Sequence, residues 1–398
     1  MSLPQLEDLP ITAGTRALVR MDFNVPLRGG VIDDDLRISA ALPTLLWLRA
    51  RGASIVACSH LGRPKGAPDP AFSLAPVARR LSELLAAPVS LAPEVVGEQA
   101  SKMAQVLEPG DVLLLENLRF DAGETANTPA FADALCALGD VYVNDAFGAS
   151  HRSHASIVGP PAVLPSAAGR LLYREVEVLS GRLSEPERPF VAILGGAKVS
   201  DKLAVIEALL ERADTILVGG AMAFTFFLAQ GHQVGTSLVE PDMVETCARL
   251  LETGRVHVPV DVVVAQQFSA ESPTRTVLAA EMPGDWMGLD VGPVTADAYA
   301  SVIARAATVL WNGPMGVFEM EPFAAGTRRV AQAVAECEGF TVVGGGDSAS
   351  AVRQMGLADR IDHVSTGGGA SLELIEQGDL PGLVALRAAA VRLKERES

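Results

Sequence analysis

Cationic side chains recur just after short apolar runs in the first half of the chain. The runs Arg16–Met21, Ser54–Cys58 and Val112–Leu115 are typical of strands in a parallel β-sheet. Ligands of open α/β sheets bind beyond the carboxyl ends of such strands. Because guanidinium groups bind phosphate and carboxylate through paired N–H donors, the cations together predict a site for one small, phosphate-bearing anion. These cations are His60, Arg63, Arg119, Arg152 and Arg37.

Some of these positions also have a simpler explanation. Asp22 and Asn24 share one face of an extended segment with Arg20, which alone would suit a solvated strand end with an Asx turn. Arg37 opens a helical pattern directly after Asp33–Asp35, and it could pair with those aspartates. The anion site is therefore predicted from the combination of residues and not from any one of them.

Glycine pairs and triplets end five apolar runs in the second half of the chain, at 191–196, 215–220, 308–313, 340–346 and 363–369. An apolar run that ends in glycine before a helical pattern indicates a parallel strand entering a βα turn. Glycine at such a turn lets the backbone approach a phosphate or a nucleotide ring. Lys198 and Lys202 follow the first glycine pair, where a mobile point charge would suit a phosphoryl group. This half is therefore predicted to hold a nucleotide.

Apolar runs alternate with helical patterns throughout, which predicts an α/β fold of two doubly wound parallel-sheet domains, each Rossmann-like. At 398 residues the chain is too long for one compact core. The expected division is an anion-binding domain at 1–166, a hinge helix at 167–189 and a nucleotide-binding domain at 190–378. Besides the strands above we expect a strand at Val141–Val143 and helices at Ile38–Arg51, Pro76–Leu85, Pro129–Leu138, Ala167–Gly181 and Leu383–Glu397. Periodicity does not decide which domain the last helix covers.

Charge and composition argue against several classes of protein and site. A net charge of −16 argues against a nucleic-acid or anionic-membrane surface. The chain has no long uncharged apolar run, and its polar, acidic start does not resemble a signal peptide, so we expect a cytoplasmic protein. The four cysteines are scattered in apolar segments, as reduced core thiols are. His151 and His154 flank Arg152, but no further ligand is evident nearby, so no zinc site is expected.

A series of ordered motifs runs nearly end to end and closely resembles the phosphoglycerate kinase family. The series contains Arg20-Met-Asp-Phe-Asn-Val-Pro, Ser59-His-Leu-Gly-Arg-Pro, Asn117-Leu-Arg-Phe, Gly195-Gly-Ala-Lys-Val-Ser-Asp-Lys, Trp286-Met-Gly-Leu-Asp, Trp311-Asn-Gly-Pro-Met-Gly-Val-Phe-Glu, Gly344-Gly-Gly-Asp-Ser and Ser365-Thr-Gly-Gly-Gly-Ala-Ser-Leu-Glu. The resemblance implies reversible phosphoryl transfer between 1,3-bisphosphoglycerate and Mg-ADP, giving 3-phosphoglycerate and ATP in glycolysis. It also implies a monomer, and a C-terminal segment, 379–398, that returns to the first domain.

The resemblance assigns roles residue by residue. The implied phosphoglycerate ligands are Asp22, Asn24, Arg37, His60, Arg63, Arg119 and Arg152. The implied nucleotide site comprises Gly195, Gly196, Lys202, Gly219, Gly220, Gly288, Leu289, Asn312, Pro314, Val317, Glu319, Gly345, Gly346, Asp347 and Ser348, with Asp347 as the Mg²⁺ ligand. The implied catalytic groups are Arg37, Lys198, Lys202, Gly345 and Gly346. Asp347 could instead be a helix N-cap.

The chain departs from the family pattern at a few positions. Ala221 stands where a third glycine is usual, Ser348 where threonine is usual, and Met315 and Met21 where valine is common. Ala149-Ser150 replaces the usual Thr-Ala before His151. None of these changes removes a charged group, so their expected effect is confined to nucleotide affinity.

The chemistry implied by the resemblance suits this residue set. The acceptor is a carboxylate, which is ionised at neutral pH, so no general base is needed. The remaining barrier is repulsion among anions in a loose transition state, which cations relieve. Because the cations and the glycine turns lie in different halves, we expect the domains to close about 164–189.

Three alternatives follow from the same kind of sheet. A dinucleotide-dependent oxidoreductase would need a Gly-x-Gly-x-x-Gly turn, and a Walker-type NTPase would need Gly-x-x-x-x-Gly-Lys-[Ser/Thr]; the sequence has neither in the required context. A two-lobed anion-binding protein would usually be exported, and paired lysines would be superfluous in it.

Overall fold

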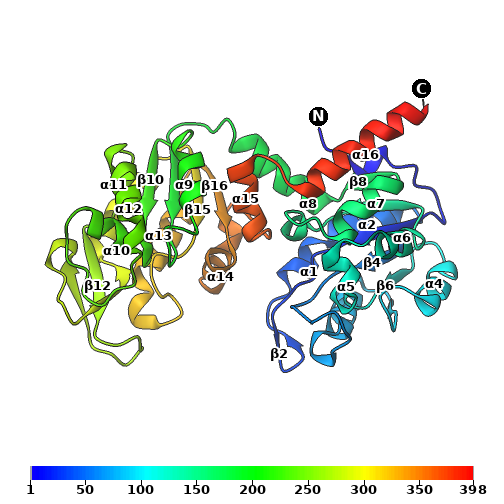
Figure 1. Cartoon of the computed structure of the whole chain (residues 1–398), viewed down its shortest axis with the longest axis horizontal. Helices are drawn as coiled ribbons and strands as arrows, with labels where there is room; N and C mark the ends of the chain where they lie inside the picture. Colours follow the sequence, from blue (N-terminus) through cyan, green and yellow to red (C-terminus); the bar gives the residue numbers. More distant parts are fainter. Residues whose placement is uncertain (1, 398) are drawn as a thin grey trace. The chain divides into compact units, whose positions relative to one another are not determined.

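A computed structural model describes residues 2–397 and divides them into two compact units. Unit 1 comprises the chain up to Glu177 together with the segment from Gln377 onward, and unit 2 is Val178–Glu376 (Figure 1). Each unit has its own six-stranded sheet. Among the described residues, no helix has both the length and the apolar character that a membrane crossing requires.

The sheet of unit 1 is parallel throughout and has the strand order β5-β6-β4-β1-β7-β8. Its strands are β1 (Arg16–Arg20), β4 (Ser54–Cys58), β5 (Val89–Leu91), β6 (Val112–Leu114), β7 (Val141–Asn144) and β8 (Ser166–Ala168). A short hairpin, β2 (Leu27–Arg28) and β3 (Val31–Ile32), follows β1. The strand order reverses at β1, between β4 and β7, so the loops after these strands meet where a ligand site is expected.

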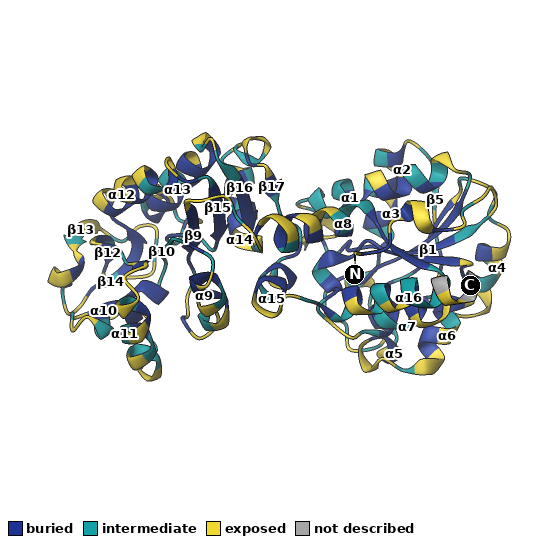
Figure 2. Cartoon of the chain, turned by 90° about the horizontal axis from the view of Figure 1, so that it is seen from above, coloured by how far each residue is buried: buried dark blue, intermediate teal, exposed yellow. Residues whose placement is uncertain are grey.

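Helices cover both faces of this sheet. They are α1 (Leu36–Ala40), α2 (Leu42–Ala50), α3 (Ala75–Leu85), α4 (Glu98–Gln105), α5 (Ala122–Ala126), α6 (Pro129–Cys136), α7 (Ala155–Val163), α8 (Arg170–Val176) and α16 (Pro381–Glu397). Successive residues of a strand face opposite sides, so Ala17 and Val19 of β1 pack with the apolar residues of α2 and α3. Tyr142 of β7 points the other way and donates to the carbonyl of Ser156 in α7 at 2.7 Å. In Figure 2 the central strands of this sheet are buried, and the helices around it are buried on some residues and exposed on others.

Unit 2 repeats this architecture, with the parallel order β11-β10-β9-β15-β16-β17. Its strands are β9 (Phe190–Leu194), β10 (Thr215–Val218), β11 (Val256–His257), β15 (Thr308–Asn312), β16 (Phe340–Gly344) and β17 (His363–Val364). Its helices are α9 (Leu203–Leu210), α10 (Met222–Ala229), α11 (Val244–Glu252), α12 (Pro293–Ile303), α13 (Ala325–Glu336), α14 (Gly346–Gln354) and α15 (Gly369–Gln377). All five glycine-ended runs contain strands of this sheet, and the predicted fold class is confirmed.

A second, antiparallel sheet in unit 2 has no counterpart in the sequence-based expectation. It consists of β12 (Asp261–Ala265), β13 (Thr274–Leu278) and β14 (Met287–Val291), in the order β13-β12-β14. β13 is largely exposed, so its residues show none of the apolar clustering that marks the other strands.

The expected single helix at Ile38–Arg51 is wrong, because the structure has two helices there. α1 ends at Ala40 and α2 begins at Leu42, with Pro43 in its first turn. Proline has no N–H, so it cannot donate to the carbonyl four residues earlier, and its ring crowds that carbonyl. A new helix therefore begins where the old one would have been interrupted. Arg37 lies on the short α1.

The expected helix at Ala167–Gly181 is wrong at its start. Residues 166–168 form β8, which pairs with β7, and α8 begins only at Arg170. Asp145, just after β7, fixes that start, because its Oδ1 accepts from the amides of Leu171 and Leu172 at 2.9 and 3.1 Å. A π-helical turn, Glu177–Arg182, then continues α8. The other expected helices differ from α3, α6 and α16 by one or two residues at an end.

Candidate active site

Asp22 and Arg37 form an ion pair just beyond β1. Nη1 of Arg37 donates to Oδ2 of Asp22 at 2.6 Å, and the Asp22 side chain is only 6% exposed. Of the aspartates that precede Arg37, Asp33 and Asp35 pair instead with Arg28 and Arg80. Burial raises the pKa of Asp22, but the nearby charges, that of Arg37 foremost, together with a backbone hydrogen bond outweigh it, and the pKa is lowered.

The loops after β1, β4 and β6 are tied together by hydrogen bonds. The amide of Gly62 donates to Oδ1 of Asn24 at 2.8 Å, and Nη1 of Arg119 donates to the carbonyl of Gly62 at 2.6 Å. Asn117, which the sequence-based site did not include, links the same loops, because its Nδ2 donates to the carbonyl of Leu61 at 2.7 Å. Gly62 has φ +60°, and a Cβ there would lie 2.4 Å from the ring of Phe72. Only glycine fits this turn.

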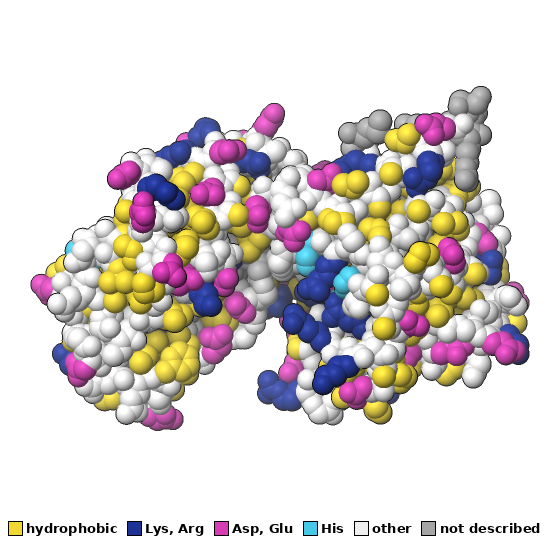
Figure 3. Space-filling view, viewed as in Figure 1, with side chains coloured by type: hydrophobic (Ala, Val, Ile, Leu, Met, Phe, Trp, Pro, Cys, Tyr) yellow, Lys and Arg dark blue, Asp and Glu magenta, His cyan; other side chains and the backbone are white. Residues whose placement is uncertain are grey.

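Positive charge gathers around these loops. Burial lowers the pKa of Arg119, and the nearby charges of Arg152, Arg20 and Arg63 lower it further. Arg152 is exposed, and its Nε contacts Nε2 of His151 at 3.0 Å. Figure 3 shows this face of unit 1 as a dense group of Lys and Arg side chains with histidines among them. Guanidinium groups that repel one another this closely indicate a place for an anion.

Two buried polar atoms in this group have no hydrogen-bond partner among the described residues. They are Oδ1 of Asp22 and Nε of Arg119. Leaving a buried polar atom unpaired costs about 1–3 kcal/mol, so such atoms often face a ligand. The structure therefore brings together the predicted anion ligands of unit 1: Asp22, Asn24, Arg37, His60, Arg63, Arg119 and Arg152.

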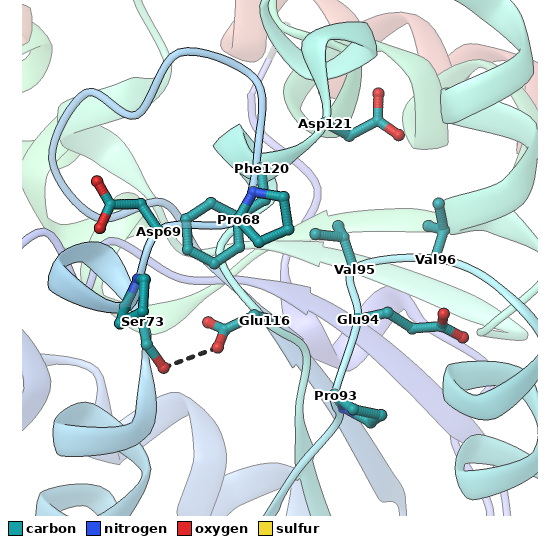
Figure 4. A pocket seen from close by; sticks show the side chains of 11 residues that line it. Pro68, Asp69, Ser73, Pro93, Glu94, Val95, Val96, Glu116, Phe120 and Asp121 are labelled. Atoms are coloured by element: carbon teal, nitrogen blue, oxygen red, sulfur yellow. Dashed lines mark hydrogen bonds between the residues drawn. The ribbon is translucent and has the colours of Figure 1, made fainter.

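A separate cavity in unit 1, of about 430 Å³, is unsuited to an anion. Four carboxyl groups line it, those of Asp69, Glu94, Glu116 and Asp121, around the ring of Phe120 (Figure 4). Each carboxylate already accepts from backbone amides, and Glu116 also accepts from the Ser73 hydroxyl at 2.7 Å. These carboxylates stabilise turns. Glu116 supports the site indirectly, because it also accepts from the amide of Asn117 at 2.8 Å.

The glycine turns of unit 2 pack against one another with no room for side chains. A Cβ on Gly195, after β9, would lie 2.0 Å from the carbonyl oxygen of Pro314, after β15. Gly220, after β10, has φ +67°, and its Cβ would lie 2.6 Å from the amide nitrogen of Gly196. Gly219 lies against Sδ of the buried Met315, where a Cβ would be 2.5 Å away. These contacts fix the turns at the strand ends.

A cavity of about 620 Å³ opens beside these turns. Its apolar walls include Phe224, Leu289 and Val317, and a Cβ on Gly288 would lie 1.9 Å from the Phe224 ring. This slot has the volume and the mostly apolar lining of a small-molecule pocket. The predicted nucleotide residues that line it are Gly196, Gly220, Gly288, Leu289, Pro314, Val317, Glu319 and Asp347. Sequence reasoning missed Phe224, although its place in the helix after Gly219-Gly220 was a usable signal.

The other predicted nucleotide residues do not line this cavity. Gly195 and Gly219 lie behind its wall, as their packing shows. Asn312, Gly345, Gly346, Ser348 and Lys202 belong to the neighbouring ends of β15 and β16 and to the turn before α9. Ala221, which does line the cavity, has an ordinary helical φ of −64°, so its backbone has no need of the family's usual glycine.

The two lysines of the first glycine turn differ in environment. Lys202 is half-buried, and its Nζ donates to Oδ1 of Asn312. Burial lowers the pKa of Lys202 to about 8, although Asp347 and Asp201 oppose the shift. Lys198 is exposed, and its charge helps to lower the pKa of Glu240. The structure thus separates a sheltered lysine beside Asn312 from an exposed one near Glu240.

The N-terminus of α14 lies next to Lys202. Gly345 has φ +89° and precedes the helix, and Asp347 is exposed in the first turn. The N-cap explanation of Asp347 is wrong, because the cap position is Gly345. Oγ of Ser348 accepts from the amide of Gly313 at 2.6 Å, so the serine hydroxyl stabilises the turn after β15. A helix N-terminus of this kind attracts phosphate.

The donor set near α14 suits a cation carried by phosphates. The described residues contain no group of three or more Asp, Glu, His or Cys side chains that could hold a metal alone. Asp347 is one of three carboxylate residues that line the nucleotide-sized cavity, with Asp290 and Glu319, and it is the one in the first turn of α14. Mg²⁺ is commonly held by one or two carboxylates together with substrate phosphates, so the residues fit a phosphate-borne Mg²⁺.

The fold and the two sites define a class: an α/β phosphotransferase of two parallel-sheet units without a Walker motif. The comparisons agree. The model of the family described as "Phosphoglycerate kinase" matches residues 6–378. A phosphoglycerate kinase from Salinispora arenicola is 57% identical over 97% of this chain and 100% of its own, and one from Rubrobacter xylanophilus is 56% identical over 94% and 95%.

Solved structures of the family have the same fold as this chain. Phosphoglycerate kinase from Coxiella burnetii superposes with a TM-score of 0.86 at 39% identity, over 98% of this chain and 100% of the other. The enzyme from Pyrococcus horikoshii gives a TM-score of 0.87 at 33% identity, over 98% and 99%. The chain belongs to the phosphoglycerate kinase family, glycolytic phosphotransferases whose acceptor is a carboxyl group.

Proposed function

We propose that unit 1 binds 3-phosphoglycerate and 1,3-bisphosphoglycerate, and that unit 2 binds ADP and ATP with Mg²⁺. The observation that supports the first assignment best is the surplus of guanidinium groups around the Asp22–Arg37 pair, with Nε of Arg119 buried and without a hydrogen-bond partner in the described part of the chain. The triose ligand carries a phosphate and a carboxylate, and both are anions that guanidinium groups bind in pairs.

In unit 2 the adenosine occupies the apolar slot between Phe224, Gly288 and Leu289, and the phosphates point to Lys202 and the N-terminus of α14. The slot is apolar on its walls, and Glu319 at its edge is placed to accept from the ribose hydroxyls. The amides of Gly345 and Gly346 lie at the start of α14, where the helix dipole favours negative charge. Ser348 holds the adjacent turn in position through Gly313.

Asp347 holds the Mg²⁺ that accompanies the nucleotide phosphates. When bound, this cation neutralises part of their charge. Asp347 belongs to the first turn of α14, close enough to Lys202 for its charge to raise the pKa of that lysine. Asp347 and Lys202 would therefore both act at the phosphate end of the nucleotide.

The transfer itself requires no general base in this chain. In the direction of ATP use, the nucleophile is the carboxylate of 3-phosphoglycerate, which is already ionised near neutral pH. The transition state spreads negative charge over the transferred group, so stabilisation by cations and amides is the main contribution. Arg37 provides the cation from unit 1, and Lys202 with the amides of Gly345 and Gly346 provides donors from unit 2. Lys198 remains an exposed, secondary contributor.

The reaction is tested with ATP, 3-phosphoglycerate and Mg²⁺, and the acyl phosphate is consumed by a reducing enzyme that oxidises NADH. We expect NADH oxidation only when all three reactants are present. ADP release that does not depend on 3-phosphoglycerate would contradict the proposal, and so would ligand binding without turnover, as a two-lobed binding protein would give. Binding of NAD to the chain itself would favour the oxidoreductase alternative.

The domain limits and the hinge are part of this proposal: 1–166 and 190–378 as the binding domains, 167–189 as hinge, and 379–398 as the returning segment. The chain passes from unit 1 to unit 2 at Glu177, inside the proposed hinge. Because the proposed ligands bind to different units, transfer requires that the two units bring them together. X-ray scattering should give a smaller radius of gyration with both substrates than with either alone. Identical curves would contradict the hinge.

We also propose that the enzyme is a cytoplasmic monomer, as the family resemblance implies. Sedimentation at micromolar concentration would contradict this proposal if it gave a dimer mass.

A further inference from the structure

Arg20, the last residue of β1, is a fully buried cation that the assigned roles do not use. Its guanidinium makes three directed contacts. Nε donates to Oγ of Ser156 at 2.9 Å, Nη1 donates to the carbonyl of Met21, and Nη2 faces Nδ1 of His60 at 3.2 Å. A buried charge is costly unless it is fully hydrogen-bonded, so this arrangement specifies one position for the side chain.

The buried carboxylate of Glu124 fixes the Nε side of this guanidinium through the hydroxyl of Ser156. Oγ of Ser156 donates to Oε1 of Glu124 at 2.7 Å, and the Ser156 amide donates to Oε2 at 2.9 Å. Glu124 is fully buried. Because the serine proton goes to Glu124, the oxygen lone pairs of Ser156 are left for Arg20. The hydroxyl therefore couples the two buried charges and fixes the direction in which Nη2 points.

This geometry determines where the proton of His60 is. A guanidinium can only donate, so Nδ1 of His60 must be an acceptor and the ring proton must be on Nε2. Oδ1 of Asp22 lies 4.0 Å from the same Nδ1, too far for a hydrogen bond that would compete. Within the described residues, Nε2 makes no hydrogen bond of its own, so it is available to a ligand.

The charges around His60 also favour its neutral form on balance. The ring faces Arg20 at the end of β1, Arg37 on α1 and Arg119 in the turn after β6, against the single carboxylate of Asp22. Burial lowers the pKa of His60 well below its ordinary value, Arg20 lowers it further, and Asp22 only partly opposes this. The imidazole is therefore neutral across the physiological pH range.

We propose that Arg20 is a positioning residue that holds His60 as the neutral tautomer with its proton on Nε2, ready to donate to an anionic oxygen of the triose ligand. The ligand assignment rests on the proposed function, but the tautomer does not. A donor that does not titrate keeps its hydrogen bond to the substrate at any pH from about 6 to 8, where an unperturbed histidine changes charge.

Nitrogen NMR of the free, full-length protein labelled with ¹⁵N-histidine measures the tautomer directly. His60 is assigned by the loss of its signals in His60→Gln. We expect a protonated, pyrrole-type Nε2 and an unprotonated, pyridine-type Nδ1, with no change from about pH 6 to 8. A protonated Nδ1, or titration near the ordinary histidine pKa, would overturn the proposal. Because no substrate is present, this outcome is independent of whether the proposed reaction occurs.

Two variants test the role of Arg20. Arg20→Met removes the donor to Nδ1, and Ser156→Ala removes only the hydroxyl that fixes the guanidinium. In Arg20→Met we expect a tautomer mixture at His60 that titrates, and a KM for 3-phosphoglycerate about tenfold higher that rises with pH between about 6 and 7, with the KM for Mg-ATP unchanged. Ser156→Ala should show the same changes to a smaller extent.

A matched control is Arg16→Met, at the other end of β1, where the guanidinium pairs with Asp140 at the surface. It should leave the His60 signals and the KM unchanged. If Arg20→Met does not fold, the spectra of Ser156→Ala and of the wild type still test the tautomer of His60 and its dependence on this network. His60 signals in Ser156→Ala and Arg20→Met that match the wild type would overturn the proposal.

Discussion

Replacing Arg37 by alanine is expected to lower kcat by about 10³ or more while nucleotide affinity stays nearly unchanged. Arginine residues that contact a transferred phosphoryl group contribute roughly 10³–10⁵ in rate, about 4–7 kcal/mol. Arg37 is held in place by its 2.6 Å contact with the buried Asp22, so its charge is positioned before the substrate arrives. Steady-state kinetics at saturating concentrations of both substrates measures the loss, and calorimetry measures nucleotide binding.

Two further variants separate charge from packing. Arg37→Lys keeps the charge but not the two-pronged geometry, so it should recover only part of the rate. Arg80→Ala is the control, because Arg80 is a partly exposed arginine on α3 that pairs with Asp35 near the same hairpin; it should retain wild-type kcat. A kcat loss below tenfold in Arg37→Ala would remove Arg37 from the catalytic role.

The second large effect is expected for Lys202→Met, with kcat lower by about 10²–10³. Removing one donor aimed at developing negative charge costs that much in other enzymes, about 2.7–4 kcal/mol. Lys202 is the sheltered lysine of the glycine turn, and its Nζ is directed by Asn312. Lys198→Met should have a smaller effect, because Lys198 is exposed beside Glu240. Lys102→Met, on the surface of α4, is the neutral control.

The pH dependence provides an independent readout for Lys202. Burial lowers its pKa to about 8, so the free enzyme loses this charge as the pH rises through about 8. We therefore expect kcat/KM for the nucleotide to fall above that pH, while kcat falls at higher pH because bound phosphates favour the charged form. In Lys202→Arg the decline should move beyond the alkaline range. A decline that is unchanged in Lys202→Arg would assign it to another group.

The parts of the fold that follow from local pattern were predictable from the sequence. β4 was expected with its exact limits, and the five glycine-ended runs of unit 2 all contain strands, because buried parallel strands are short apolar runs that end at turns. The break between α1 and α2 was also readable from Pro43 but was missed. β8 was not readable, because Ser166–Ala168 carries no β-branched or aromatic residue and becomes a strand only through its pairing with β7.

The candidate site also has a part that was predictable from the sequence and a part that was not. The arginines and glycines stand out by type and by their positions at strand ends, and the structure places those of unit 1 around one set of loops. The buried hydrogen-bond network of Arg20, Ser156 and Glu124 is not evident from the sequence. Glu124 reads as a surface acid in a polar segment and Ser156 as an ordinary helix residue, yet both are buried against Arg20. Their partners are far away in sequence, so no spacing within one segment could indicate the contact.

The position of α16 affects the order in which the chain completes its fold. α16 packs on α7 and β8, and its Leu383 and Leu386 are fully buried, so unit 1 is complete only when a segment that follows unit 2 in the sequence has packed on it. Unit 2 is one contiguous segment, Val178–Glu376, so its core needs no residue from outside that segment. Unit 2 can thus complete its fold without α16, whereas in unit 1 the apolar surface of α7 stays open to water until α16 packs on it.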